Sequence, residues 1–222
     1  MQEPPYFKKI LSYLYPIVIE RRGGILDHEL EVRLERGRIV LNTKNANYSF
    51  GSLHKVWRKA LSNVEVLKEH KILVLGAGVG SIRKILHEEM GVKAHLTMVE
   101  FDPVVLEIGS EYFGFGETPL LCIELADAFE YCRSTQEKFD LILIDLFVDK
   151  EMPGYLIENS FWEDMKSCCA PNATILLNTI VHDEKSRSRV NTIQKTLSNL
   201  QGDLSKITLQ DINHLFILKT RS

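Results

Sequence analysis

The pattern of apolar and polar residues changes near residue 70, and the longer part that follows predicts alternating strands and helices. Short continuous apolar runs are typical of strands buried on both faces, whereas apolar residues recurring every three or four positions are typical of helices. The predicted strands are 72–75, 94–99, 120–123, 141–144, 174–177, 206–209 and 214–218. The predicted helices are 126–134, 161–169, 185–200 and 81–90, whose apolar face holds Ile82, Ile85, Leu86 and Met90. This alternation predicts an α/β fold in which helices flank a mostly parallel sheet.

The first 62 residues follow a different pattern, in which β-like segments precede one helical segment. Arg36-Gly37 separates two of these segments and indicates a hairpin, and Gly23-Gly24 indicates an earlier turn. The β-like segments are 16–20, 30–35 and 38–43, and the helical segment 52–61 places Leu53, Val56, Trp57 and Leu61 on one face. We therefore expect a small β-hairpin region with its connecting helix over 1–62, and a Rossmann-like domain over 63–222.

Composition and charge are those of an ordinary globular protein. Apolar residues make up 45% of the 222 residues, charged residues 26%, and the formal net charge is −3. This balance gives no general attraction to nucleic acid or to an anionic membrane, and no apolar run reaches the roughly 18 residues of a membrane span. The N-terminal residues lack the basic and apolar regions of a signal peptide. We therefore expect a cytoplasmic protein that binds neither nucleic acid nor membrane.

The four cysteines do not form a metal-ligand pattern. None belongs to a C-x-x-C pair, and His and Cys are not clustered at the spacing that metal sites use. They are Cys122, Cys132, Cys168 and Cys169. We expect reduced thiols in packing roles and no bound metal.

A glycine-rich turn, residues 76–80, directly follows the first strand of the longer part. Without Cβ atoms, Gly76, Gly78 and Gly80 allow a tight turn and a close approach to a ligand. The next helix directs its free N–H groups and positive dipole end at the same place, so 76–80, Ala77 included, is predicted to bind a pyrophosphate or an amino-acid carboxylate. The dinucleotide fingerprint has glycine where this chain has Ser81, which disfavours NAD. A tight turn without a ligand is the structural alternative.

An acidic residue, Glu100, ends the second predicted strand. A carboxylate at this position can accept hydrogen bonds from both hydroxyls of a ribose, and it would repel the 2′-phosphate of NADP. We assign Glu100 and the adjacent Phe101 to the cofactor site. Asp102, which precedes Pro103, is better explained as a helix N-cap. The alternative for Glu100 is a solvated charge at a strand end.

Further carboxylates follow the third and fourth predicted strands. Asp127 could accept a hydrogen bond from an adenine amino group while the Ala128 N–H faces a ring nitrogen, although a helix N-cap explains Asp127 equally well. Asp145 ends the most apolar strand, where it could bind an amine or take its proton, and Asp149 could assist it. The alternatives are a loop anchor for Asp145 and a plain surface charge for Asp149.

Together these segments resemble the spermidine synthase family, a branch of the class I S-adenosylmethionine-dependent methyltransferase fold. The resembling segments are 72–80, 99–103 with Glu107 and Tyr112-Phe113, 126–128, and 139–145. The resemblance implies a mostly parallel seven-stranded sheet with a short N-terminal β-rich extension, and a homodimer. It also implies that Gly76, Gly78 and Gly80 line the aminoacyl tail and sulfonium, that Glu100 holds the ribose, and that Asp145 deprotonates the attacking amine.

The chain departs from that family at its amine-binding motifs. Val79 stands where the family has an aspartate, and 145–149 and 47–50 lack the polar residues of the corresponding family stretches. These losses disfavour putrescine binding and favour the intact methyl donor, S-adenosylmethionine. We therefore expect methyl transfer to an unidentified small acceptor. The alternatives are aminopropyl transfer from decarboxylated S-adenosylmethionine, nucleoside binding without catalysis, and an NAD-dependent oxidoreductase.

Overall fold

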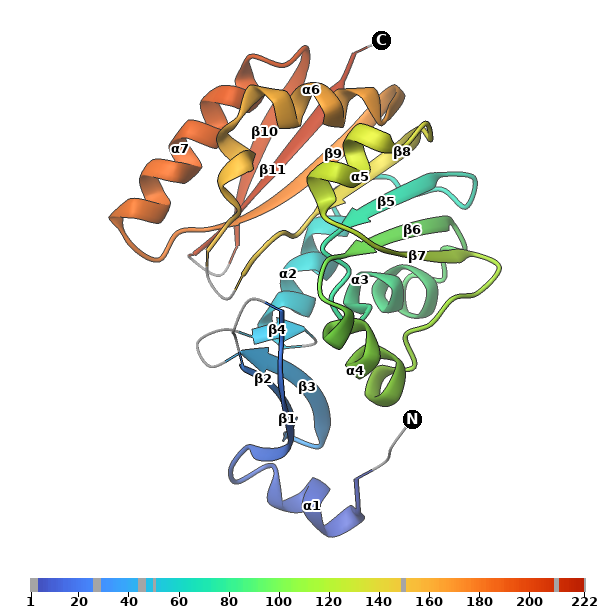
Figure 1. Ribbon diagram of the computed structural model, residues 1–222, viewed down its shortest axis with the longest axis vertical. Helices are drawn as coiled ribbons and strands as arrows, with labels where there is room; N and C mark the ends of the chain where they lie inside the picture. The colour runs from blue at the N-terminus through green and yellow to red at the C-terminus, as the bar shows by residue number, and fades with distance from the viewer. Residues whose placement is uncertain are drawn as a thin grey trace.

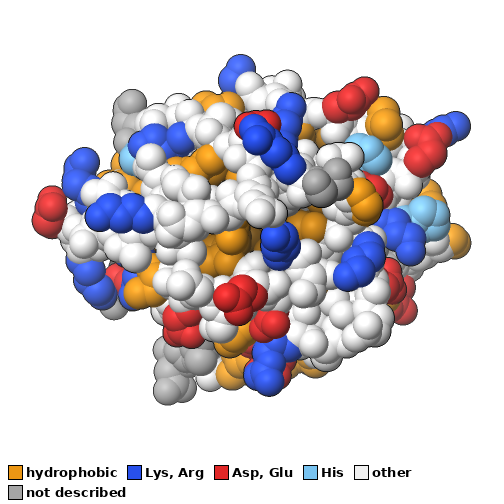
Figure 2. Space-filling view, turned by 90° about the horizontal axis from the view of Figure 1, so that it is seen from above, with side chains coloured by type: hydrophobic (Ala, Val, Ile, Leu, Met, Phe, Trp, Pro, Cys, Tyr) orange, Lys and Arg blue, Asp and Glu red, His pale blue; other side chains and the backbone are white. Residues whose placement is uncertain are grey.

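The computed structural model describes residues 4–25, 29–43, 47–49, 51–148, 151–209 and 212–221. It contains a seven-stranded sheet flanked by helices and a four-stranded sheet built from the N-terminal residues (Figure 1). Among the described residues, no helix is long and apolar enough to cross a membrane. Viewed from the end at which α6 and β10 lie, the surface carries basic and acidic side chains interspersed with one another (Figure 2).

The larger sheet has the strand order β10-β11-β9-β8-β5-β6-β7. Strands β5 to β9 are parallel, whereas β11 is antiparallel to both of its neighbours, β9 and β10. Their bounds are β5 (Lys71–Leu75), β6 (His95–Glu100), β7 (Leu121–Leu125), β8 (Phe139–Ile144), β9 (Cys169–Ile180), β10 (Gly202–Leu209) and β11 (Asn213–Thr220). This topology confirms the predicted class I methyltransferase fold, and every strand predicted beyond residue 70 is present.

Helices cover both faces of this sheet because its central strands are apolar on both sides. One face packs against α5 (Ala128–Ser134), α6 (Asn159–Ser167) and α7 (Glu184–Ser198). The other face packs against α2 (Ser52–Leu61) and the helix that starts with α3 (Ser81–Arg83). The strands β5 and β8 lie between these layers, and Ile72 to Leu75 and Ile142 to Ile144 are fully buried.

The predicted helix 81–90 differs from the structure in one respect. After α3 it continues as a π-helix, Lys84–Glu89, whose wider turn changes which side chains face the sheet. Met90, expected on the apolar face, is 40% exposed, while His87 is 8% exposed and hydrogen-bonds to the Ala94 carbonyl at 2.9 Å. Burial lowers the pKa of His87, which favours the neutral ring.

The N-terminal sheet has the order β1-β2-β3-β4 and is antiparallel. Its strands are β1 (Ile17–Gly23), β2 (Glu29–Glu35), β3 (Arg38–Thr43) and β4 (Asn47–Ser49), preceded by the short helix α1 (Tyr6–Leu11). Arg36 and Gly37 have φ of 48° and 76°, which confirms the predicted hairpin and suits a two-residue turn of the primed type. The sequence pattern did not predict α1 and β4.

This smaller sheet packs against α4 (Pro103–Phe113), beside the glycine-rich turn. Leu30 and Val32 belong to the same buried cluster as Val79 of the turn and Val105 of α4. The cluster therefore brings the N-terminal sheet close to the carboxyl edge of β5 and β6.

Candidate functional site

The glycine-rich turn between β5 and α3 is shaped by close packing inside the protein. Gly76, Gly78 and Gly80 have φ of 86°, 54° and 89°, a region that side chains disfavour. A Cβ atom on Gly76 would lie 2.2 Å from the Asp145 carbonyl oxygen, and one on Gly80 would lie 2.5 Å from the Phe115 ring. Gly76 and Gly80 are therefore needed for the fold itself, whether or not a ligand is bound.

Several N–H groups of the turn already have acceptors within the protein. The Gly76 and Ala77 N–H groups both donate to the Val99 carbonyl, at 3.0 and 2.9 Å. The Gly78 N–H donates to the Glu100 carboxylate at 2.8 Å. The turn is thus not an open cradle of N–H groups for a pyrophosphate, which argues against the NAD alternative. Gly76 and Gly78 remain half-exposed, whereas Ala77 is buried and contributes to the shape of the turn.

Glu100 lies at the carboxyl end of β6 and is 5% exposed. Its carboxylate accepts hydrogen bonds from the N–H groups of Gly78, Phe101 and Asp102, at 2.8, 3.0 and 3.2 Å. Burial raises the pKa of Glu100 to about 7, although these three hydrogen bonds oppose the rise. A carboxylate has about four acceptor positions, so one remains for a ligand hydroxyl. The Phe101 side chain is 44% exposed beside it.

The two carboxylates expected to cap helices do so. Asp102 accepts from the Val104 N–H at 2.9 Å and from the Ile25 N–H of the N-terminal part at 3.0 Å. Asp127 accepts from the first turn of α5 through Oδ1 alone. Its Oδ2 has no hydrogen bond to the described residues, and Ala128, the first residue of the helix, has no acceptor in its own helix for its N–H. Oδ2 of Asp127 thus lies without a partner among the described residues, beside the first N–H of α5.

Asp145 follows β8 and is held by two neutral donors. The indole Nε1 of Trp57 on α2 donates to its Oδ2 at 2.7 Å, and Nδ2 of Asn178 on β9 donates to its Oδ1 at 2.9 Å. Asn213, at the start of β11, donates in turn to Oδ1 of Asn178 at 3.0 Å. Burial raises the pKa of Asp145 to about 6, with no cation among the described residues to lower it.

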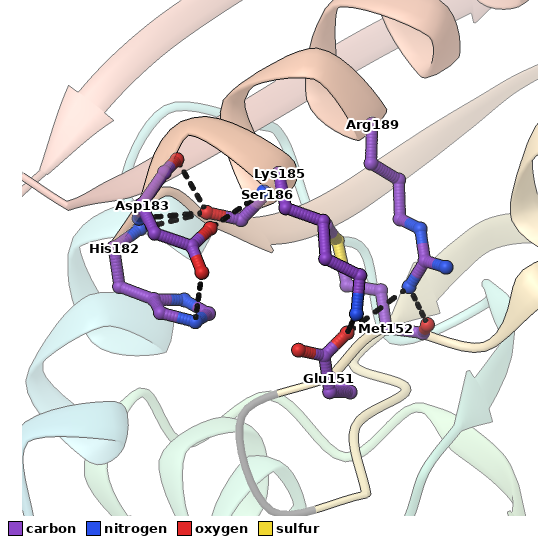
Figure 3. A network of polar contacts seen from close by, with 7 residues as sticks. All are labelled: Glu151, Met152, His182, Asp183, Lys185, Ser186 and Arg189. Atoms are coloured by element: carbon purple, nitrogen blue, oxygen red, sulfur yellow. Dashed lines mark hydrogen bonds and ion pairs between the residues drawn. The ribbon is translucent and has the colours of Figure 1, made fainter.

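The segment that follows Asp145 is tied to α7 (Figure 3). Arg189 donates to the Met152 carbonyl at 2.6 Å and forms an ion pair with the Glu151 carboxylate at 3.4 Å. Lys185 forms a second ion pair with Glu151, also at 3.4 Å. Nearby, Asp183 and Ser186 form a capping box at the start of α7. Asp149, the second predicted catalytic residue, lies outside the described residues.

The predicted residues Glu100, Asp127 and Asp145 lie at the carboxyl ends of β6, β7 and β8, at the same edge of the sheet. A hollow of about 530 Å³ lies among residues such as Lys71, His95 and Glu117 at the opposite edge, and none of the predicted site residues lines it. Within the described residues, no group of three or more His, Cys, Asp or Glu side chains is placed to hold a metal ion.

Sequence reasoning missed the side chains that hold Asp145. Trp57, predicted on the apolar face of 52–61, is a core residue whose indole N–H donates to the carboxylate. Asn178 directly follows the apolar run 174–177, the same signal that singled out Asp145. Asn213 precedes an antiparallel strand, so it lies at the same edge as the carboxyl ends of the parallel strands. These two positions could therefore have been found from the strand pattern.

The strand order, the glycine-rich turn and the aligned carboxylates define an α/β protein of the class I methyltransferase fold. Residues 58–209 match the Spermine/spermidine synthase domain, and the chain belongs to this family.

Its curated relatives include both methyltransferases and aminopropyltransferases. The chain is 30% identical over 139 residues to the eEF1A lysine and N-terminal methyltransferase of Homo sapiens, a match that covers 55% of this chain and 20% of the relative. It is 30% identical over 115 residues to the polyamine aminopropyltransferase of Vibrio vulnificus (strain CMCP6), covering 50% and 38%. The chain thus spans between a fifth and two fifths of the length of these relatives.

Solved structures share the fold at lower identity. A probable spermidine synthase from Corynebacterium glutamicum ATCC 13032 superposes with a TM-score of 0.75 at 15% identity, covering 90% of this chain and 79% of that one. Human methyltransferase-like protein 13 in complex with SAH superposes with a TM-score of 0.62 at 21% identity, covering 78% and 83%. These likenesses concern the fold alone.

Proposed function

We propose that the chain binds S-adenosylmethionine at the carboxyl edge of β5 to β8 and transfers its methyl group to a small acceptor beside Asp145. The observation that carries this proposal is the surrounding of Asp145. A partly buried carboxylate held only by neutral donors favours a cationic ligand, because a positive charge would offset the cost of desolvating the ionised form. Both the sulfonium donor and an amine acceptor carry such a charge.

The remaining contacts follow the order of the strands. Glu100 would accept from a ribose hydroxyl at its remaining acceptor position, with Phe101 beside the nucleoside. Asp127 would accept from the adenine amino group through its available Oδ2, while the Ala128 N–H would donate to a ring nitrogen. Gly76 and Gly78, which are half-exposed, would approach the aminoacyl tail. This assignment is supported by the membership of the Spermine/spermidine synthase domain family and by relatives named as methyltransferases and aminopropyltransferases.

In the proposed reaction, Asp145 takes one proton from the cationic acceptor amine, and the neutral nitrogen then attacks the methyl carbon as the bond from carbon to sulfur breaks. The sulfonium becomes a neutral thioether, and the methyl group becomes bonded to the acceptor nitrogen, which regains a positive charge. A base with a pKa of about 6 is suited to this role near neutral pH. The protein would contribute mainly by positioning the two reactants and stabilising the changing charge.

Val79 supports methyl transfer over aminopropyl transfer. Its side chain is 1% exposed and packs with Leu30, Val32 and Val105. The aspartate that the resembling family has here would be surrounded by apolar side chains in this chain, at a cost in desolvation. S-adenosylmethionine has a carboxylate of its own beside its amine, so it does not require that aspartate. Decarboxylated S-adenosylmethionine lacks this carboxylate, and with Val79 its amine has no acidic partner at this position.

Aminopropyl transfer is the second candidate function. It is supported by the match to a polyamine aminopropyltransferase and by the fold likeness to a probable spermidine synthase over 90% of this chain. Binding without catalysis is the third. Comparing the affinities for S-adenosylmethionine and its decarboxylated form tests the first against the second.

Glu100→Gln is expected to weaken S-adenosylmethionine binding by about 1.5–3 kcal/mol, because a charge-assisted hydrogen bond to the ribose is lost. The ionised carboxylate is the better acceptor, and the pKa of Glu100 is about 7 in the free protein. Affinity in the unaltered protein should therefore rise between about pH 6.5 and about pH 8, and this rise should disappear in the variant. Isothermal titration calorimetry at both pH values measures both effects.

The matched control is Glu117→Gln, an exposed glutamate at the opposite edge of the sheet. Its affinity and pH dependence should equal those of the unaltered protein. An unchanged affinity in Glu100→Gln would refute the ribose role.

A further inference from the structure

We propose that Asn213 and Asn178 form a positioning pair that holds the carboxylate of Asp145 in one orientation for the reaction. The pair lies on β9 and β11, outside the proposed cofactor site on β5 to β8. These two strands would therefore determine the protonation and orientation of Asp145, the residue that contacts the acceptor. The consequence for transfer rests on the proposed function, whereas the pair itself is defined by contacts within the protein.

The contacts form one continuous chain across the carboxyl edge of the sheet. Asn213 donates to Asn178 at 3.0 Å, Asn178 donates to Asp145 at 2.9 Å, and Trp57 donates to the other oxygen of Asp145 at 2.7 Å. Asn178 and Asn213 are 1% and 5% exposed, and Trp57 is fully buried. Buried polar groups of this kind are costly unless paired, so each side chain restricts the orientation of the next.

The direction of the hydrogen bonds gives the pair its function. A side-chain amide has a donor end and an acceptor end, and its orientation follows from its partners. Because Asn213 donates to the Asn178 oxygen, the NH₂ group of Asn178 faces Asp145. A donor at this position favours the ionised carboxylate over the protonated acid. Without Asn213, the Asn178 amide could turn and present its oxygen, to which only a protonated Asp145 could donate a hydrogen bond.

Charged neighbours do not explain the state of Asp145. The elements around Asp145 carry titratable groups that include His54, Lys55, Arg58 and Lys59 on α2, Glu100 on β6, His182 after β9 and His214 on β11. His54 and Arg58 pair with Glu89. The pKa of Asp145 is raised by burial and lowered by its hydrogen bonds with Asn178 and Trp57, without a contribution from any of these charges.

The indole N–H of Trp57 can report the protonation of Asp145, and that of Trp162 can serve as an internal control. The chain has two tryptophans, and each indole N–H donates one hydrogen bond within the protein. Trp57 donates to Asp145, whereas Trp162 donates to the Leu156 carbonyl at 2.9 Å, a group that does not titrate. In ¹⁵N-tryptophan-labelled protein, the Trp57 indole signal should therefore follow the protonation of Asp145, while the Trp162 signal should stay constant.

The experiment is a pH titration of these two signals in the ligand-free full chain. The unaltered protein should show a Trp57 midpoint near pH 6, as the pKa of Asp145 requires. Asn178→Leu should raise the midpoint by about one pH unit, because a hydrogen bond to the charged form is lost. Asn213→Ala should raise it by about half a unit, although Asn213 does not touch Asp145. If Asn178→Leu does not fold, the Trp57 midpoint of Asn213→Ala alone tests the proposal.

Thr179→Val is the matched control. Thr179 is the neighbour of Asn178, is fully buried and donates to the His214 carbonyl on β11 at 2.7 Å. The substitution removes a hydrogen bond between the same two strands without touching Asp145, so its midpoint should stay that of the unaltered protein. Equal shifts in Thr179→Val and Asn213→Ala would overturn the proposal, as would a Trp57 signal that still titrates in Asp145→Asn.

The two proposals can fail separately. If S-adenosylmethionine does not bind but Asn213→Ala shifts the Trp57 midpoint, the proposed function is wrong and the positioning pair stands. If the donor binds but Asn213→Ala leaves the midpoint unchanged, the positioning pair is wrong and the proposed function stands.

Discussion

Gly76→Ala is expected to lower the free energy of unfolding by about 2–5 kcal/mol. The φ of 86° costs a residue with a Cβ atom about 1–2 kcal/mol, and overpacking adds about 1–3 kcal/mol. The overpacking is severe because the new Cβ atom would lie 2.2 Å from the Asp145 carbonyl oxygen, which is backbone and cannot rotate away. Urea denaturation measures the change.

Gly91→Ala is the control for this prediction. Gly91 has a φ of 70°, but a Cβ atom there would meet nothing within 4 Å. The free energy of unfolding of the control should therefore fall only by the cost of the positive φ, about 1–2 kcal/mol. Equal losses in both variants would show that the close approach of β5 and β8 has no effect of its own. The expected difference would confirm that the turn is required by packing beside Asp145.

Asp145→Asn is expected to reduce the transfer rate by a factor of about 10²–10⁴, the usual contribution of a positioned general base. The amide cannot take the acceptor proton. Binding of S-adenosylmethionine should change much less, because most of its proposed contacts involve other residues. The measurement is the transfer of labelled methyl groups from the donor to a panel of primary amines, with donor affinity determined in parallel by calorimetry.

Asp140→Asn is the control on the same strand. Asp140 lies at the amino end of β8, where it accepts a hydrogen bond from the Lys71 N–H at 2.8 Å. Its variant should retain the full transfer rate. Full turnover in Asp145→Asn would remove Asp145 from the catalytic role.

The features that the sequence predicted well depend on neighbouring residues. The apolar run 141–144 predicted a buried strand, Asp102 before Pro103 predicted a helix start, and Arg36-Gly37 predicted a tight hairpin. Each signal depends on residues a few positions apart, and each element has the predicted type. The positions of Glu100 and Asp145 at one edge follow because parallel strands end on the same side.

The features that the sequence did not predict depend on distant or cooperative contacts. Trp57 and Asp145 are 88 residues apart, and Asn178 and Asp145 are 33 apart, so their contacts require the strand order as well as the strands. The π-helical turn that exposes Met90 has no periodic signature of its own. The helix α1 spans six residues and buries none of them, so its few apolar residues gave too short a pattern to predict a helix.

The most direct test of the account is calorimetry of the full chain with S-adenosylmethionine, its decarboxylated form and NAD, each at about pH 8. We expect saturable binding of S-adenosylmethionine, weaker binding of the decarboxylated form, and no binding of NAD. Tighter binding of the decarboxylated form would replace methyl transfer with aminopropyl transfer. Binding of neither sulfonium compound would contradict the account.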